Sequence, residues 1–276
     1  KFVEQPRHIE IQILGDSHGN VIYLNERECS IQRRHQKVIE EAPSPFISDA
    51  TRKAMGEQAV ALAKAVQYQS AGTVEFIYDA KEQHYYFLEV NTRLQVEHGV
   101  TEEVWGVDLV SWMIRLAAGD LPSLESLRAD LKPKGHAIQV RVYAEDPAKD
   151  FQPCAGLLSH VQWPEAQAGV RIDHWIESGI EVPAFFDPML AKVIVHGDTR
   201  EQALQLLSQT LADSRLYGIE TNLAYLQFLL RDETFVQAKM TTRYLNHLRY
   251  SPARIEVLQG GTQTTIQDYP GRQGYW

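Results

Sequence analysis

Two runs in which polar and apolar residues alternate constrain the fold of this chain more than any other feature of its sequence. In residues 7–14, His8, Glu10 and Gln12 alternate with isoleucines. Residues 89–97 repeat the pattern, with Glu, Asn, Arg, Gln and Glu at the odd positions. Because successive side chains of a strand point to opposite faces, such a run, if extended, has one polar and one apolar face. In residues 89–97 the polar face is either a solvent-exposed face or a functional site. We expect the first run to be a half-buried strand.

Turn residues and helical periodicity divide the rest of the chain into an α+β arrangement. The further expected strands are 21–24, 73–78, 85–90, 136–144, 157–163, 170–176, 189–196 and 255–258. The expected helices run from Ser48 or Asp49 to before Gly72, over 101–118, from a capping box at Thr199 and Gln202 to Gly218, and over 221–230. No helix or strand is expected in the polar stretch 25–41.

Proline and glycine in residues 119–135 mark a domain boundary. The sequence thus predicts a first domain over 1–120, a second over 134–248, and the truncated start of a third over 255–276. The last part is too short to bury a core alone. Because the chain opens without Met and ends in a turn-rich segment, we interpret it as a piece of a longer protein.

Composition excludes several classes of protein. The 276 residues are 44% hydrophobic and 23% charged, as in globular chains, and no stretch approaches the roughly 20 apolar residues of a membrane helix. A net charge of −9 argues against nucleic acid or an anionic membrane surface as the main partner. Cys29 and Cys154 show no metal-ligand or redox spacing, so we expect a reducing, cytoplasmic environment.

Three polar side chains predict a cation site. An antiparallel pairing of 73–78 with 85–90 would place Glu75 and Glu89 side by side, and two carboxylates that close repel unless a cation lies between them. With the amide oxygen of Asn91 they form a hard-oxygen set suited to Mg²⁺ held against nucleotide phosphates. The alternative is a surface acid pair without a ligand, which the apolar neighbours of both acids disfavour.

Basic residues indicate an anionic substrate. The run Gln32-Arg-Arg-His-Gln-Lys37 is either a solvated surface or an anion site. Arg141 lies in the middle of an expected strand, where a buried guanidinium needs a partner. That partner is either a ligand or one of the nearby acids, Glu145 and Asp146. The residues alone therefore indicate an ATP- and magnesium-dependent enzyme with an anionic co-substrate.

Several long motifs stand out in the sequence. They are Pro6-Arg-His-Ile-Glu-Ile-Gln12, Glu28-Cys-Ser-Ile-Gln-Arg-Arg-His-Gln-Lys37, Glu40-Glu-Ala-Pro43, Glu89-Val-Asn-Thr-Arg-Leu-Gln-Val-Glu-His98 and Arg141-Val-Tyr-Ala-Glu-Asp146. Together they resemble the biotin carboxylases of the ATP-grasp superfamily. A generic ATP-grasp ligase, such as a carbamoyl phosphate synthetase, would share the metal pattern but not Arg-x-Gln-Val-Glu-His. The resemblance implies an ATP-grasp half-domain with an antiparallel sheet and helices, followed by a smaller α+β biotin carboxylase C-terminal domain.

The resemblance also implies roles for matching residues. Those expected to hold Mg²⁺ or Mn²⁺ on ATP are Glu75, Glu89 and Asn91. Those expected to bind the nucleotide are Lys1, Val3, His8, Gln32, His35, Glu75 and Glu89. Those expected to bind bicarbonate are Lys37, Arg93, Gln95, Val96 and Glu97. Glu97 would deprotonate bicarbonate for attack on ATP to give carboxyphosphate, Arg141 would stabilise the enolate of biotin, and Lys37 and Arg93 would assist catalysis.

Two departures from the family pattern are visible. The N-terminal half of the family, with its glycine-rich lid, has no counterpart in this stretch. The stretch is therefore expected to be inactive by itself. Gly99 stands where many relatives carry proline.

The tail from Gly260 to Trp276 resembles the opening of the carboxyltransferase region of urea carboxylases, which is related to allophanate hydrolase subunit 2 and KipA-like proteins. This implies carboxylation of urea to allophanate, with a biotin carrier and a carboxyltransferase domain on the same longer chain, and a possible homo-oligomer. The alternatives are the biotin carboxylase part of an acyl-CoA, pyruvate or guanidine carboxylase, or a non-catalytic scaffold. The complete set of polar site residues argues against a scaffold.

Overall fold

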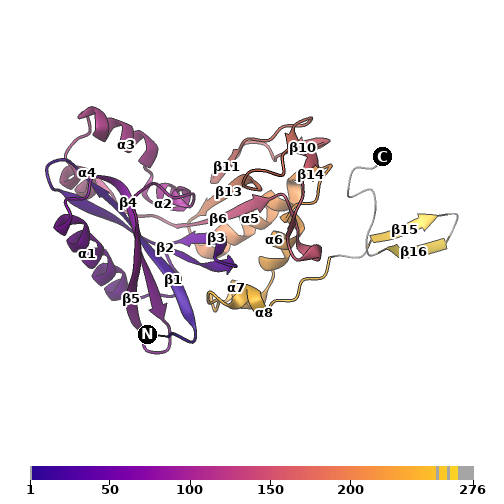
Figure 1. The fold of residues 1–276 in the computed structure, drawn as a ribbon, viewed down its shortest axis with the longest axis horizontal. Coiled ribbons are helices and arrows are strands. Elements are labelled where there is room, and N and C mark those ends of the chain that lie inside the picture. The colour runs from indigo at the N-terminus through magenta and orange to yellow at the C-terminus, as the bar shows by residue number, and fades with distance from the viewer. Residues whose placement is uncertain (1, 253–254, 260–261, 267–276) are drawn as a thin grey trace. The chain divides into compact units, whose positions relative to one another are not determined.

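The computed structural model describes residues 2–252, 255–259 and 262–266 and confirms the predicted α+β class (Figure 1). Its chain divides into two compact units. The first unit comprises Lys1–Gln139, Ile194–Leu204 and Ala238–His247, and the second comprises Val140–Val193, Gln205–Gln237 and Leu248–Trp276.

The first unit is built on an antiparallel sheet. Its strands are β1 (Pro6–Gly15), β2 (Val21–Arg33), β3 (Gln36–Ala42), β4 (Ser70–Asp79) and β5 (His84–Asn91), in the order β3-β2-β1-β4-β5. Its helices are α1 (Asp49–Ala65), α2 (His98–Trp105), α3 (Leu109–Ala118), α4 (Leu124–Asp130) and α8 (Tyr244–His247). The polar stretch 25–41 is therefore most of a hairpin formed by β2 and β3, which the sequence analysis missed.

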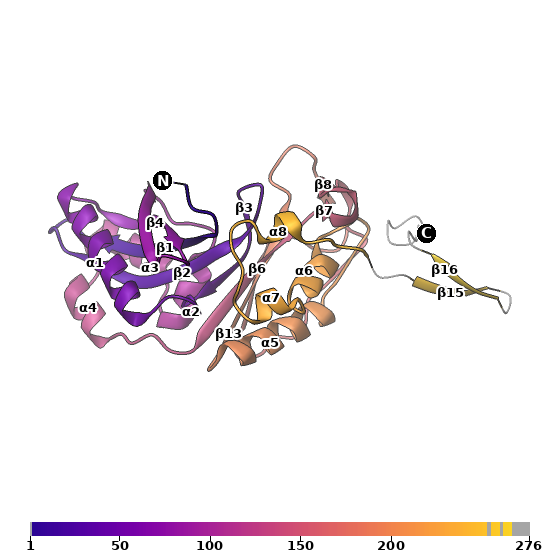
Figure 2. The same ribbon diagram turned by 90° about the horizontal axis from the view of Figure 1, so that it is seen from below.

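The two faces of this sheet carry different side chains. Ile9, Ile11 and Ile13 of β1 pack with Met55 and other small or apolar residues of α1, which runs alongside the sheet (Figure 2). Leu14 points to the opposite face and packs in a cluster with residues of α2, α3 and α4. By the same alternation, the polar residues of β1 lie on that opposite face.

The prediction that residues 7–14 form a half-buried strand is half right. The strand exists, but every residue from Arg7 to Gly15 is buried, on the polar face as well as the apolar one. The polar side chains are buried because they contact one another and polar residues of neighbouring strands. This burial of a polar face determines where the functional site lies.

The expected helix over 101–118 is two helices. Gly106, with a φ of 64°, ends α2 in the left-handed conformation that favours glycine. Asp108 then begins α3, its side chain accepting a hydrogen bond from the amide of Ser111 at 2.8 Å. Residues 119–135, expected as a boundary, contain α4, whose Leu124 is buried in the core of the first unit.

The second unit contains short strands and helices. They are β7 (Glu145–Asp146), a 3₁₀ turn (Pro147–Lys149), β8 (Gln152–Pro153), β9 (Gly156–Leu157), β10 (His160–Gln162), β11 (Val170–His174), β12 (Glu181–Val182), β14 (Arg215–Tyr217), α6 (Leu223–Leu229) and α7 (Glu233–Val236). Three elements contribute residues to both units: β6 (His136–Tyr143), β13 (Met189–Gly197) and α5 (Arg200–Asp213).

Sequence expectations for this part are met in outline. The capping box is confirmed, because Thr199 and Gln202 each accept a hydrogen bond from the other's backbone amide. The helix ends at Asp213 rather than at Gly218, because β14 lies between them. The strand expected over 157–163 is divided between β9 and β10.

The predicted strand after residue 254 is confirmed as β15 (Ile255–Gln259), which pairs with β16 (Thr262–Ile266). Residues 260–261 and 267–276, which carry much of the carboxyltransferase-like motif, lie outside the described residues. The proposed domain limits remain predictions. Among the described residues, no helix has both the length and the apolar character needed to cross a membrane.

Candidate active site

The predicted pairing of two acidic residues is confirmed. Glu75 of β4 and Glu89 of β5 are directly opposite each other in the antiparallel ladder. The amide nitrogen of Asn91 donates to Glu75 at 2.8 Å and to Glu89 at 3.2 Å. Glu75 is buried and Glu89 is exposed. These two carboxylates and one carboxamide supply hard oxygen donors of the kind that Mg²⁺ prefers.

Residues 89–97 are extended only as far as Asn91, where β5 ends. The chain then turns, and Glu97 takes the N-cap position of α2. This turn buries Gln95 and Glu97, whereas a continued strand would have carried them away from β4. Gln95 donates from Nε2 to the carboxylate of Glu75 at 2.8 Å, so the bend returns its amide to the acidic pair.

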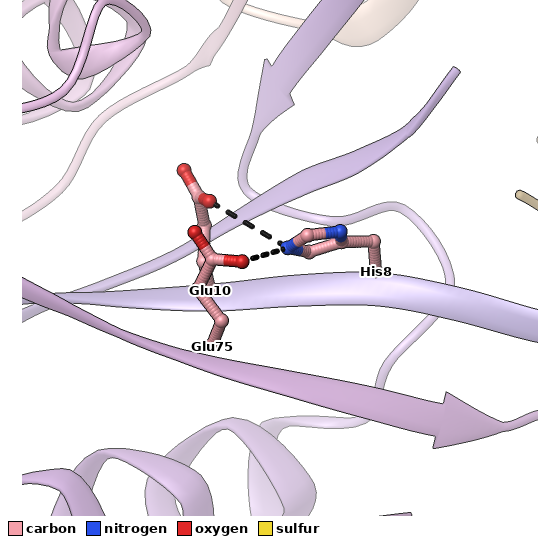
Figure 3. Close-up of side chains that lie close together, drawn as sticks. All are labelled: His8, Glu10 and Glu75. Atoms are coloured by element: carbon pink, nitrogen blue, oxygen red, sulfur yellow. Dashed lines mark ion pairs between the residues drawn. The ribbon is translucent and has the colours of Figure 1, made fainter. Parts of the chain in front are cut away.

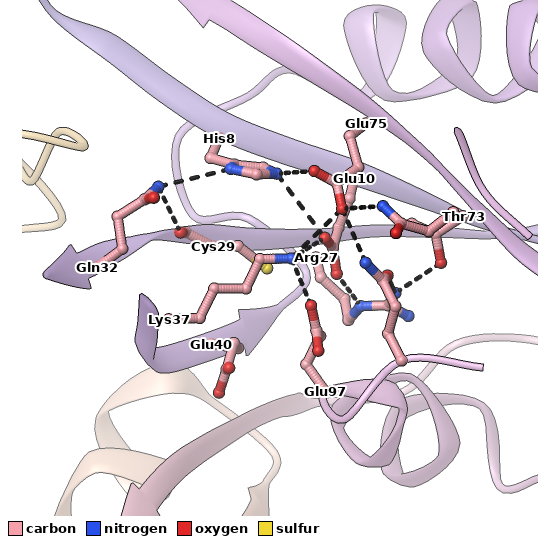
Figure 4. A network of polar contacts seen from close by, with 12 residues as sticks. His8, Glu10, Arg27, Cys29, Gln32, Lys37, Glu40, Thr73, Glu75 and Glu97 are labelled. Atoms are coloured by element: carbon pink, nitrogen blue, oxygen red, sulfur yellow. Dashed lines mark hydrogen bonds and ion pairs between the residues drawn. The ribbon is translucent and has the colours of Figure 1, made fainter. Parts of the chain in front are cut away.

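Lys37 joins the acids of three different segments. Its Nζ lies 2.5 Å from Oε2 of Glu10 and 3.6 Å from Oε1 of Glu75, and it also contacts the carboxylate of Glu97 (Figure 4). Burial by itself lowers the pKa of Lys37, but the carboxylates of Glu10 and Glu97 raise it above its ordinary value. Lys37 therefore stays positively charged beside the candidate base Glu97.

His8 and Gln32 extend the site along β1 and β2. Nε2 of His8 lies 2.6 Å from Oε2 of Glu75 and 3.9 Å from Oε2 of Glu10 (Figure 3). Nε2 of Gln32 lies 3.5 Å from Nδ1 of the same imidazole. The three side chains His8, Glu10 and Glu75 are close enough to share a metal ion.

Two buried residues of this network, Glu10 and Arg27, were missed as site residues. Glu10 accepts from Nε of Arg27 at 2.6 Å as well as from Lys37, and both Glu10 and Arg27 are fully buried. The alternation of polar and apolar residues in β1 was a signal for Glu10, but it was interpreted as a half-buried strand with a solvent-exposed polar face. Nothing in the run around Arg27 distinguishes it from the surface-type charges beside it.

The cations of the site keep its acids ionised. Burial by itself raises the pKa of Glu10, but Lys37 and Arg27 outweigh it and hold that pKa at about 2. Burial also raises the pKa of Glu75, but the hydrogen bond from His8 and the charge of Lys37 lower it to about 2. Both carboxylates are therefore charged at neutral pH.

This network predicts that the sheet is less stable at acidic pH. Folded Glu10 and Glu75 titrate near pH 2, against an ordinary value of 4.5. The unfolded segment therefore binds more protons over this range, and the free energy of local unfolding falls as the pH drops from about 4.5 to 2. Hydrogen exchange of peptides from β1 and β4, corrected for the intrinsic pH dependence, measures this loss. Glu10→Gln should flatten the dependence, and the exposed-residue control Glu57→Gln should not.

Four other predicted residues have more peripheral positions. Arg93 is exposed, and its Nη2 lies 3.4 Å from Oδ1 of Asn91. His35 is exposed at the tip of the β2–β3 hairpin, with a φ of 67°. Val3 is buried and Val96 is half-buried, while Lys1 lies outside the described residues.

Arg141 belongs to the second unit, where it lies buried in β6. Asn222 fixes this part of the strand, since its amide nitrogen donates to the carbonyl of Arg141 at 2.9 Å. Its amide oxygen accepts from the backbone of Tyr143 at 2.8 Å. Asn222 thus holds the backbone of β6 at Arg141 and at Tyr143.

Comparisons with known proteins identify relatives of this chain. Residues 1–124 match the family described as carbamoyl-phosphate synthase L chain, ATP binding domain, and residues 139–247 match the biotin carboxylase C-terminal domain. The urea amidolyase of Saccharomyces cerevisiae is 48% identical over 276 residues, which are 100% of this chain and 15% of that protein. The chain is homologous to biotin carboxylases. It is homologous to urea amidolyases over its whole length.

Two further relatives show how much of this chain the match covers. The human mitochondrial propionyl-CoA carboxylase alpha chain is 51% identical over 247 residues, which are 89% of this chain and 34% of that one. The biotin carboxylase domain of Hydrogenobacter thermophilus 2-oxoglutarate carboxylase, solved with MgADP and bicarbonate, is 42% identical with a TM-score of 0.84, over 89% of this chain and 53% of that one. The chain thus spans between 15% and 53% of the length of these relatives.

Proposed function

We propose that this chain forms part of an ATP-dependent biotin carboxylase that uses bicarbonate, within a longer protein that carboxylates urea. The observation that carries the proposal is the contact of Lys37 with the buried acid Glu97, beside the acidic pair that includes Glu75. A cation and a fixed base next to hard-oxygen donors suit an anion that must be deprotonated and then attack a phosphoryl group.

The residues divide the first step between them. Lys37, Arg93, Gln95 and the backbone of Val96 hold bicarbonate, and Glu97 takes its proton. An oxygen of the resulting carbonate attacks the γ-phosphorus of ATP and the bond to ADP breaks, giving carboxyphosphate and ADP. Mg²⁺, when bound by Glu75, Glu89 and Asn91, neutralises charge on the phosphates.

Other residues of the chain contact the nucleotide and biotin. His8, Gln32, His35, Val3 and Lys1 line the nucleotide. Carboxyphosphate decomposes to CO₂ and phosphate, and the phosphate accepts the proton of biotin N1′. Arg141 stabilises the negative charge on the ureido oxygen while the new bond to CO₂ forms. The biotin is carried on a separate domain of the same longer chain.

The extent of the homology supports urea as the final acceptor. The match to a urea amidolyase extends over all 276 residues, whereas the match to the human propionyl-CoA carboxylase chain covers 247. We therefore propose that a carboxyltransferase domain of the same longer chain transfers the carboxyl group to urea, forming allophanate.

The deciding experiment measures ADP release by the biotinylated full-length protein with ATP, Mg²⁺ and bicarbonate, with and without urea. Release should depend on bicarbonate and rise strongly with urea. Bicarbonate-dependent release that ignores urea would move the acceptor to another amide or an acyl compound. Release without any dependence on bicarbonate would contradict the biotin carboxylase function.

A further inference from the structure

The side chain at the centre of the buried network has no role in the mechanism above. Arg27 of β2 is fully buried and donates to five acceptors on four different segments. Figure 4 shows it beside Glu10 and Thr73. Its donors meet Glu10 at 2.6 Å, Gln12 at 2.6 Å, Gln95 at 2.9 Å, Thr101 at 3.0 Å and Thr73 at 3.2 Å. A guanidinium has five N–H donors, so each one has an acceptor here.

We propose that Arg27 is a positioning residue that orients the bicarbonate pocket through Gln95 and Glu10. The inference deepens the proposed function and rests on it. Arg27 does not reach the reacting atoms itself. It acts by fixing which atoms of two neighbouring side chains face the anion.

The first link runs through the amide of Gln95. A guanidinium only donates and a carboxylate only accepts, so Gln95 satisfies both neighbours in one orientation, with Oε1 toward Arg27 and Nε2 toward Glu75. Nε2 has two hydrogens, and Glu75 takes one of them. The orientation set by Arg27 therefore directs the donor end of this amide into the pocket, where an anion needs donors.

The second link runs through Glu10 to Lys37. Oε1 of Glu10 accepts from Arg27, and Oε2 accepts from Lys37 at 2.5 Å. One carboxylate thus lies between two cations, each on a different oxygen. Because Arg27 fixes one oxygen, the other is held toward Lys37 and keeps that ammonium beside Glu97.

Lysine in place of arginine isolates this role. Arg27→Lys keeps the positive charge that the buried Glu10 requires, but an ammonium has three donors for five acceptors. At least two of the acceptors lose their hydrogen bond, and Gln95 is free to turn. In the full-length protein we expect the KM for bicarbonate to rise about tenfold and the KM for MgATP to change by less than about twofold.

A matched control is provided by a second arginine–glutamate pair of the same unit. Arg52 of α1, which is partly buried, donates from Nε to both oxygens of Glu26, which is buried like Glu10. Its other contacts are with Asp49 and Ser44, which are not bicarbonate residues. Arg52→Lys should lower stability without changing the ratio of the two KM values. Equal changes in both variants would overturn the proposal, because the effect would then be structural.

A double variant tests the link through Gln95. If Arg27 acts through this amide, then Arg27→Lys raises the KM for bicarbonate less in a Gln95→Ala background than in the wild type. If the two substitutions raise the KM for bicarbonate independently, so that their fold-changes multiply, the link through Gln95 is overturned. If Arg27→Lys has the same KM for bicarbonate as the wild type, the positioning role alone is overturned. If the wild-type enzyme itself releases ADP without any dependence on bicarbonate, the proposed function is overturned.

A milder change covers the case in which Arg27→Lys fails to fold. Nη2 of Arg27 donates both to Oγ1 of Thr73 and to Oε1 of Gln95. Thr73→Val removes the first of these two acceptors and preserves the shape of the side chain. It should raise the KM for bicarbonate about threefold with the KM for MgATP unchanged. An unchanged KM for bicarbonate in this variant contradicts the proposal.

Discussion

The Glu97→Gln variant of the full-length protein should bind ATP normally and lose bicarbonate-dependent ADP release by a factor of about 10² to 10⁴. Glutamine has nearly the same shape, and its oxygen still accepts the contact from Lys37 that holds the residue in place. An amide does not take up the proton of bicarbonate, so the oxygen that attacks ATP is not generated. The change therefore removes the base and preserves the pocket.

The measurement for Glu97 is steady-state ADP release against bicarbonate concentration, with nucleotide binding measured separately. Glu103→Gln, on the same helix α2 but outside the buried part of the site, is the matched control and should behave as wild type. ADP release at the wild-type rate in Glu97→Gln would remove this residue from the role of base. Lost nucleotide binding would show instead that Glu97 supports the fold of the site.

Local patterns predicted β1, β4 and β5, because each depends on a short run of residues. The short connection between β4 and β5 was enough to predict that Glu75 lies opposite Glu89. The sequence did not indicate that the extended chain would end at Asn91, since the bend that follows is favoured by contacts that form only in the fold. Gln95 reaches Glu75 across 20 positions of sequence.

Buried polar residues are where the sequence was least informative. Arg27 contacts Gln95 and Thr101, which lie 68 and 74 positions away, and no local pattern encodes such pairs. The same difficulty hid most of β2 and the whole of β3. Their polar residues looked like a solvated stretch, but Arg27 and Lys37 donate to the fully buried carboxylate of Glu10. Polarity in a run of residues thus predicts exposure poorly when the site itself is polar.

The two acids of the candidate metal site should respond differently to loss of charge. We expect both Glu89→Gln and Glu75→Gln to raise the Mg²⁺ concentration for half-maximal activity by at least about tenfold, since each removes a charged oxygen donor. Glu89 is exposed, so its variant should keep wild-type stability. Glu75 is buried and accepts hydrogen bonds from Asn91 and Gln95, so its variant should also be less stable.

Activity against Mg²⁺ concentration, together with hydrogen exchange of β4 and β5, separates these effects. Glu82→Gln, an exposed change in the turn between the same two strands, serves as the control and should alter neither quantity. Wild-type Mg²⁺ dependence in Glu89→Gln would exclude this residue from the metal site. The main role of Glu75 would then be to orient His8 and Gln95. If both variants lose Mg²⁺ affinity and only Glu75→Gln loses protection, the cation lies between the strands, with one ligand anchored in the network and the other facing solvent.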